Sequence, residues 1–293
     1  MIFADALSVY RERLEANPAL KPSAKLYRRK CIEALTKSWS GLLETDVRRI
    51  SEQDCLNWAA SFGQKYSAGV YNNTVGTLRH VIEIAIASGA RYGNPANAIK
   101  KLRVKQKVLK LPEHDEFLAL VQSIQNAGAW CSRSCADLVR FLAFGGFRKG
   151  EAAQITWEDC DFQKGEITVK GDAETGTKNW SVRRVPMIPE MRALLETIRE
   201  ARKSEADTVP VMLVNECQGA LDKASKKGGI SRITHHDLRH LFATRCIESG
   251  VDIPTVSRWL GHKDGGALAM KVYGHLRDQH SVNMAQKVSF SRS

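Results

Sequence analysis

The sequence contains no run of eighteen apolar residues, so it predicts no membrane-spanning helix. Its first residues carry neither a basic flank nor a long apolar stretch, which argues against a secretory leader. Cysteine is scarce and odd in number, with seven in 293 residues. That pattern is typical of free thiols in a reducing compartment rather than of a disulfide framework. We therefore expect a cytoplasmic protein without a membrane partner.

The motifs of several familiar active sites are also missing. The chain has no GxxxxGK[ST] phosphate loop, no HExxH helix and no paired CxxC segments at zinc spacing. Cys131 and Cys135 could join His236 and His240 in a metal site only across about a hundred residues, and such residues more often pack between helices. The sequence therefore predicts no metal site and no bound cofactor.

The positive charge of the chain is unevenly distributed. Its formal net charge is +12, from 44 Lys and Arg against 32 Asp and Glu. Residues 1–110 hold 19 of the basic and 9 of the acidic residues, a net charge of +10, which leaves +2 for residues 111–293. The densest stretch, residues 100–110, contains no acid. This asymmetry favours a polyanionic partner such as nucleic acid, and the alternative is a solvated basic linker.

Length and hydrophobic spacing predict two domains with a mainly helical fold. Val75, Leu78 and Ile82 repeat at helical spacing within residues 71–88, and the basic stretch that follows shows no convincing period. We expect a helical domain over residues 1–99, an extended linker over 100–110, and a helical domain with a small antiparallel β-sheet over 111–293. In that last part the sequence predicts helices over 136–144, 189–203, 237–249 and 253–260, and strands over 154–157, 166–170 and 182–186.

Five polar residues stand in settings that suggest chemistry. Arg148 follows two glycines, and His262 follows a glycine that ends a predicted helix. Arg239 lies three residues after His236, which places both on one face of a helix. Tyr273 lies near the end of the sequence. Each residue taken alone is more often a surface charge or a packing group.

Taken together, these segments resemble the tyrosine recombinase family, also called phage integrases. The order and spacing of the segments make the resemblance specific, and it covers nearly all of residues 111–293. Residues 1–99, including an Asn-Pro pair at 94–95, are similar to the helical core-binding domain of that family. The matching segments are GGFRKGE at 145–151, Lys178 seven residues before the Val-Pro pair at 185–186, HDLRHLFAT at 236–244, LGH at 260–262 and YGH at 273–275.

The resemblance implies a site-specific DNA recombinase or integrase that cleaves and rejoins strands through a 3′-phosphotyrosyl intermediate. Tyr273 would be the nucleophile, with Arg148 and Arg239 on the phosphate, as two forked guanidiniums suit its oxygens. His236 would be the base and Lys178 the acid that protonates the leaving 5′-oxygen. The same resemblance places His262 on the scissile phosphate and gives Glu151 a supporting role. Lys170, Arg183 and Arg184 also flank the hairpin of Lys178.

The partners implied are double-stranded DNA attachment sites and a homo-tetramer at synapsis, with integration or excision of a phage or other mobile element as the role. Directionality or DNA-bending factors are further partners that the resemblance allows. Type IB topoisomerase-like strand breaking and resealing, a non-catalytic DNA-binding regulator on the same fold, and a Mg²⁺-dependent carboxylate transposase are the alternatives. The residues expected to contact DNA are Asn72, Asn73 and Arg79 on the helix 71–88, and Lys100, Lys101, Arg103 and Lys105 in the linker.

Overall fold

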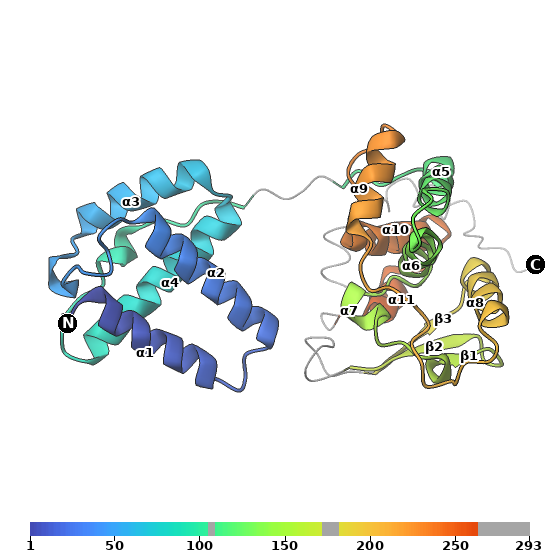
Figure 1. Ribbon diagram of the computed structural model, residues 1–293, viewed down its shortest axis with the longest axis horizontal. Coiled ribbons are helices and arrows are strands. Elements are labelled where there is room, and N and C mark those ends of the chain that lie inside the picture. Colours follow the sequence, from blue (N-terminus) through green and yellow to red (C-terminus); the bar gives the residue numbers. More distant parts are fainter. Residues whose placement is uncertain (105–108, 172–181, 263–293) are drawn as a thin grey trace, which may run out of the picture. The chain divides into compact units, whose positions relative to one another are not determined.

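The computed structural model describes residues 1–104, 109–171 and 182–262. The chain forms two compact units, residues 1–107 and 108–293, and their boundary falls within the expected connector 100–110 (Figure 1). None of the helices in these described ranges is both long and apolar enough to cross a membrane.

The N-terminal unit is built from helices that pack around α4. Ser67 caps the start of α4, because its side chain accepts a hydrogen bond from the backbone N–H of Val70. Apolar residues of α4 are buried against α1, α2 and α3. The predicted helix 71–88 is confirmed, although it begins three residues earlier. The elements are α1 (Phe3–Ala16), α2 (Pro22–Ser38), η1 (Val47–Arg49), α3 (Glu52–Lys65), α4 (Ala68–Ala87) and η2 (Pro95–Ala98).

The described residues of the C-terminal unit form one hydrophobic core, at whose centre lies α6. This helix contacts α5, α8 and α10, and most of its residues are buried. The predicted helices 136–144, 189–203, 237–249 and 253–260 correspond to α6, α8, α10 and α11. The helices are α5 (His114–Gln125), α6 (Ser132–Gly145), α7 (Lys149–Ala152), α8 (Pro189–Ala201), α9 (Gln218–Lys227), α10 (His235–Glu248) and α11 (Ile253–Leu260), with a 3-10 turn η3 (Trp157–Asp159).

A small antiparallel sheet completes this unit (Figure 1). Its strands are β1 (Cys160–Asp161), β2 (Glu166–Val169) and β3 (Arg183–Pro186), in the order β1-β2-β3. The predicted pairing of 166–170 with 182–186 is confirmed, with Ile167 opposite Val185. The predicted class, mainly α with a small antiparallel sheet, is therefore confirmed.

The strand predicted over residues 154–157 is wrong. Thr156 forms only an isolated bridge with Pro210, and the chain then enters η3. The backbone N of Val211 donates to the carbonyl oxygen of Ile155 at 2.9 Å beside this bridge, and the turn of the chain into η3 at Trp157 ends the regular pairing. The apolar residues that suggested a strand, Ile155 and Trp157, are buried in the core without belonging to the sheet.

Candidate active site

Arg148 lies where the chain passes from α6 to α7. Gly146 follows the last residue of α6 and has a φ of +62°, a left-handed conformation that glycine adopts without strain. A Cβ atom at Gly146 would lie 2.4 Å from Cδ1 of Phe242 in α10, so only glycine fits this close approach. Phe147 is fully buried next to it. These contacts fix the start of α7, where the side chain of Arg148 remains 39% exposed.

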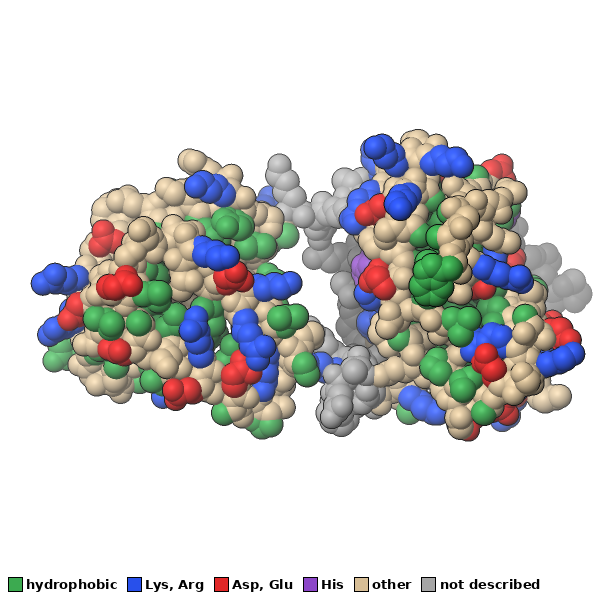
Figure 2. All heavy atoms as spheres, viewed as in Figure 1, with side chains coloured by type: hydrophobic (Ala, Val, Ile, Leu, Met, Phe, Trp, Pro, Cys, Tyr) green, Lys and Arg blue, Asp and Glu red, His purple; other side chains and the backbone are tan. Residues whose placement is uncertain are grey.

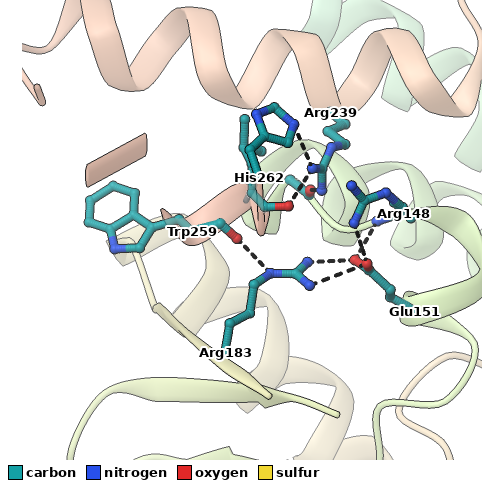
Figure 3. Close-up of polar contacts among 8 residues, drawn as sticks. Arg148, Glu151, Arg183, Arg239, Trp259 and His262 are labelled. Atoms are coloured by element: carbon teal, nitrogen blue, oxygen red, sulfur yellow. Dashed lines mark hydrogen bonds and ion pairs between the residues drawn. The ribbon is translucent and has the colours of Figure 1, made fainter. Parts of the chain in front are cut away.

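Glu151 is buried and binds two arginines (Figure 3). Its Oε2 accepts a hydrogen bond from the backbone N of Arg148 at 2.9 Å, and its Oε1 accepts one from Arg148 Nη1 at 2.7 Å. Arg183 donates to the same carboxylate, from Nη1 to Oε1 at 3.2 Å and from Nη2 to Oε2 at 2.5 Å. Burial raises the pKa of Glu151, but the hydrogen bonds and charge of Arg183, with the hydrogen bonds of Arg148, outweigh it and hold that pKa below its ordinary value. The supporting carboxylate is therefore ionised at neutral pH.

The register of the sheet explains why Arg183 points inward. Val169 is paired with Arg183 and Ile167 with Val185, so Arg183 lies on the same face of β3 as the buried Val185. Its side chain is 8% exposed, and its Nε donates a hydrogen bond to the carbonyl oxygen of Trp259 at 2.7 Å. Arg183 was not among the predicted site residues. The period-two burial of the strand was the signal that could have found it.

The start of α10 is fixed by a reciprocal cap. Oγ1 of Thr234 accepts a hydrogen bond from the backbone N of Asp237, and Oδ2 of Asp237 accepts one from the backbone N of Thr234 at 2.9 Å. The aspartate in the HDLRH segment therefore sets where the helix begins. That start positions His236 in the first turn and Arg239 in the second.

Arg239 joins the ends of two other helices. It is 3% exposed, and its Nη1 donates to the carbonyl oxygen of Gly146 at 2.6 Å. Its Nη2 donates to the carbonyl oxygen of Leu260 and lies 3.3 Å from Nε2 of His262. These carbonyls belong to the C-terminal ends of α6 and α11, where the helix dipole favours a positive charge. Arg148, Glu151, Arg239 and His262 are thus brought together, as Figure 3 shows.

His262 follows a second tight helix end. Gly261 has a φ of +69° at the end of α11, and the backbone N of His262 donates to the carbonyl oxygen of Ser257 at 3.0 Å. His236 lies on the exposed side of α10, with its ring centroid 4.5 Å from that of His240 in an edge-to-face arrangement. The structure therefore places His262 beside Arg239, and it places His236 one turn before Arg239 on α10.

Two of the predicted catalytic residues, Lys178 and Tyr273, lie outside the described residues, as does Lys105 of the predicted linker contacts. Of the other cations beside the hairpin, Lys170 forms an ion pair of 2.7 Å with the buried Asp159. The hydrogen bond that Lys170 donates to the Asp159 carboxylate raises the pKa of Lys170 above its ordinary value. Lys170 is therefore a structural partner of Asp159.

The polar residues predicted to lie in a DNA groove make contacts within the N-terminal unit. Asn72 exchanges two hydrogen bonds with the backbone of Leu102, at 2.8 and 2.9 Å. Asn73 donates to the carbonyl oxygen of Gly69 at 2.7 Å, and Arg79 donates through Nε to that of Ala96 at 3.0 Å. These contacts favour a structural role on α4. In contrast, the predicted linker contacts Lys100, Lys101 and Arg103 are exposed.

The described part of the site carries an excess of positive charge. Three guanidiniums, those of Arg148, Arg183 and Arg239, converge on a region that holds one carboxylate (Figure 3). Such a cluster suits an anion with several oxygens, since guanidinium donors form forked hydrogen bonds. Within residues 1–104, 109–171 and 182–262, no group of three His, Cys, Asp or Glu side chains is arranged to hold a metal ion.

Comparison with known proteins assigns the family. The tyrosine recombinase XerC of Lactobacillus delbrueckii subsp. bulgaricus is 26% identical over 284 residues, which cover 91% of this chain and 92% of that protein. The fold is similar to that of the Tn1549 transposon integrase in complex with transposon right end DNA, with a TM-score of 0.72, 19% identity and coverage of 98% of this chain and 99% of that one. It is also similar to a lambda integrase tetramer bound to a Holliday junction, with a TM-score of 0.72, 19% identity and coverage of 90% and 75%.

The match to the phage integrase family extends over residues 108–280. This range includes every residue that the sequence predicts to be catalytic, from Arg148 to Tyr273. Because the match covers more than half of the chain, the protein belongs to the phage integrase family.

Proposed function

We propose that this protein is a site-specific DNA recombinase that cleaves and rejoins strands through a covalent 3′-phosphotyrosyl intermediate. The observation that carries the proposal is the convergence of Arg148, Arg239 and His262 in the unit that matches the family. The relative with 26% identity is named a tyrosine recombinase, and the similar folds belong to integrases bound to DNA. Integration or excision of a mobile element is the role that fits these names.

The arginine cluster supports binding of a phosphodiester as it gains charge. Attack on phosphorus adds a second negative charge to the group in a five-coordinate transition state. Arg148 presents a partly exposed guanidinium, and Arg239 adds a fixed charge from the buried side, beside His262. Donors held in place before the reaction lose no energy in reorganising, and the loss of one typically costs roughly 10²–10³ in rate.

The bond changes follow from the proposed roles. The phenolic oxygen of Tyr273 attacks the phosphorus, His236 takes the phenolic proton, and the bond from phosphorus to the 5′-oxygen breaks. Lys178 gives a proton to that leaving oxygen. A 5′-hydroxyl of the second strand then attacks the phosphotyrosine, which restores a phosphodiester and releases Tyr273. The energy of the broken bond is kept in the tyrosyl link, so this scheme uses neither ATP nor a metal ion.

We assign DNA capture to both units. Residues 1–99 would act as a core-binding domain, residues 100–110 as a basic linker along the phosphates, and residues 111–293 as the catalytic domain. On the face shown in Figure 2, basic and acidic side chains are interspersed over the described residues of both units. Because exchange between two duplexes needs four cleavages, we propose that four protomers assemble on DNA, as in the similar lambda integrase tetramer. We place the reaction in the cytoplasm.

A suicide substrate tests the proposal. The wild-type protein is incubated with a nicked attachment-site fragment in EDTA, and denaturing gels are used to detect a covalent protein–DNA complex. We expect the complex with the wild type and with Tyr92→Phe, a control that removes the phenol oxygen from a fully exposed tyrosine in the N-terminal unit. We expect normal DNA binding and no complex with Tyr273→Phe.

Three other results would contradict the proposal. A complex formed by Tyr273→Phe would exclude that residue as the nucleophile. Resealing of a single duplex without exchange between two sites would indicate topoisomerase-like activity instead. Cleavage that is abolished by EDTA and leaves no bond to the protein would indicate a metal-dependent nuclease or transposase.

A further inference from the structure

The guanidinium of Arg183 is buried and forms its hydrogen bonds with other residues of the protein. Its Nε binds the carbonyl oxygen of Trp259, and its Nη1 and Nη2 bind the two carboxylate oxygens of Glu151. The side chain is 8% exposed, compared with 39% for Arg148 and 68% for the neighbouring Arg184. To contact DNA, Arg183 would have to give up these hydrogen bonds. A direct contact with substrate therefore does not explain its position.

The position of Arg183 is explained by the negative charge of the buried Glu151. This carboxylate is 2% exposed and touches Arg148 directly, so by itself it would cancel much of the positive charge that Arg148 offers to a phosphate. The effect is strong because charges interact more strongly in a buried site than in water. Arg183 supplies a second positive charge to the same carboxylate, so the group of three keeps a net charge of +1.

Arg183 also connects the two halves of the site. It is bound on one side to Glu151 in α7, and on the other to the carbonyl of Trp259 near the end of α11. A Cβ atom at Gly261 would lie 3.1 Å from Cδ of Arg183, so glycine leaves room for the arginine chain to pass. The next residue is His262, beside Arg239. The contact with Trp259 thus fixes the turn that presents His262.

We propose that Arg183 is a positioning residue for strand cleavage, which balances the charge of Glu151 so that Arg148 acts on the scissile phosphate, and which holds the turn that carries His262. This inference rests on the proposed recombinase function. It assigns to Arg183 no contact with DNA and no transfer of protons.

A charge-compensation experiment tests the role. Single-turnover cleavage of the suicide substrate and the Kd for uncleaved DNA are measured for the full-length wild type, Arg183→Met, Glu151→Gln, the double variant and Arg183→Lys. Arg184→Met is the matched control, since it removes a guanidinium from the adjacent, outward-facing position of the same strand. Urea unfolding of each variant shows that it is folded under the assay conditions.

In Arg183→Met the unbalanced Glu151 would withdraw Arg148 from the phosphate, and since the loss of one such donor typically costs roughly 10²–10³ in rate, we expect cleavage to be roughly 10²-fold slower with an unchanged Kd. Adding Glu151→Gln removes the carboxylate that is no longer balanced, so the double variant should recover about tenfold over Arg183→Met. Arg183→Lys keeps the charge without the fork and should lie between the wild type and Arg183→Met. Arg184→Met should cleave like the wild type.

Other results would overturn the inference. A double variant as slow as Arg183→Met, or slower, would exclude charge balance as the role of Arg183. A less stable Arg183→Met or Arg183→Lys variant that cleaves at the wild-type rate would show that the residue serves the fold alone. A parallel weakening of Kd and rate would indicate a DNA contact. If the wild type forms no tyrosyl complex, the proposed function fails and the role of Arg183 fails with it. A wild-type complex with an unaffected Arg183→Met rate contradicts only the present inference.

Discussion

Gly146 provides the most direct test of how the backbone supports the arginine cluster. The methyl group added in Gly146→Ala should lower the free energy of unfolding for two reasons. A left-handed φ of +62° costs a residue with a side chain roughly 1–2 kcal/mol. The Cβ atom would also lie 2.4 Å from Cδ1 of Phe242, which is 2% exposed in the core, and such overpacking costs about 1–3 kcal/mol. We therefore expect a loss of roughly 2–5 kcal/mol in the free energy of unfolding.

Gly128→Ala is the matched control. Gly128 has a φ of +74° in the same unit, and a Cβ atom there would have nothing within 4 Å, so only the backbone cost of about 1–2 kcal/mol applies. Equilibrium urea unfolding of the full chain, followed by circular dichroism, measures both variants. Equal losses would refute the argument from close packing. Because the carbonyl oxygen of Gly146 accepts a hydrogen bond from Arg239, cleavage should also fall further in Gly146→Ala than in the control.

Three more predictions concern charge. Arg148→Ala should slow cleavage by roughly 10²–10³ with little effect on Kd, and it should lower the urea midpoint because it removes a partner of the buried Glu151; an equal loss of affinity and rate would indicate simple phosphate anchoring. The pKa of Glu151 is lower in the folded protein than the ordinary value of 4.5, so the unfolded chain binds this proton at a higher pH than the folded chain does. The stability that the ionised Glu151 contributes is therefore present above pH 4.5 and is lost as the pH falls below 4.5. In Glu151→Gln the free energy of unfolding should therefore fall less steeply with decreasing pH than in the wild type, by at most about 1.4 kcal/mol per pH unit. A slope equal to that of the wild type would contradict the conclusion that Glu151 is ionised in the folded protein. Joint replacement of Lys100, Lys101 and Arg103 by Gln should reduce the slope of log Kd against log salt by about 0.9 for each lost phosphate contact, whereas an unchanged slope would remove these residues from the interface.

Local patterns predicted the helices well because helical spacing depends on residues close together in the chain. The apolar stripe from Val75 to Ala85 indicated α4, and the glycine after Leu260 indicated the end of α11. The failed strand at 154–157 had the right residue types, but its bridge partner, Pro210, lies more than fifty residues further along. Pairing of that kind depends on tertiary structure and leaves no mark in the local pattern.

The site is predicted only in part, because local motifs identify some of its residues and tertiary contacts determine the others. The motifs identified Arg148, Arg239 and His262, and the structure brings them together with Glu151. The sequence does not single out Arg183, since a charged residue in a short strand suggests a solvated position. Its burial depends on Glu151 and Trp259, which are 32 and 76 residues away in the chain.

The contacts of Arg239 have a consequence for the timing of activity during synthesis. Its two carbonyl acceptors come from α6 and α11, and the residue itself lies in α10. A nascent chain that has emerged only as far as α10 lacks the acceptor at Leu260 and the histidine that follows. Of these two acceptors the guanidinium then keeps only the one at Gly146, so a polypeptide that ends at α10 would have an incomplete phosphate site. Cleavage would then require synthesis beyond α11, as far as the proposed nucleophile Tyr273.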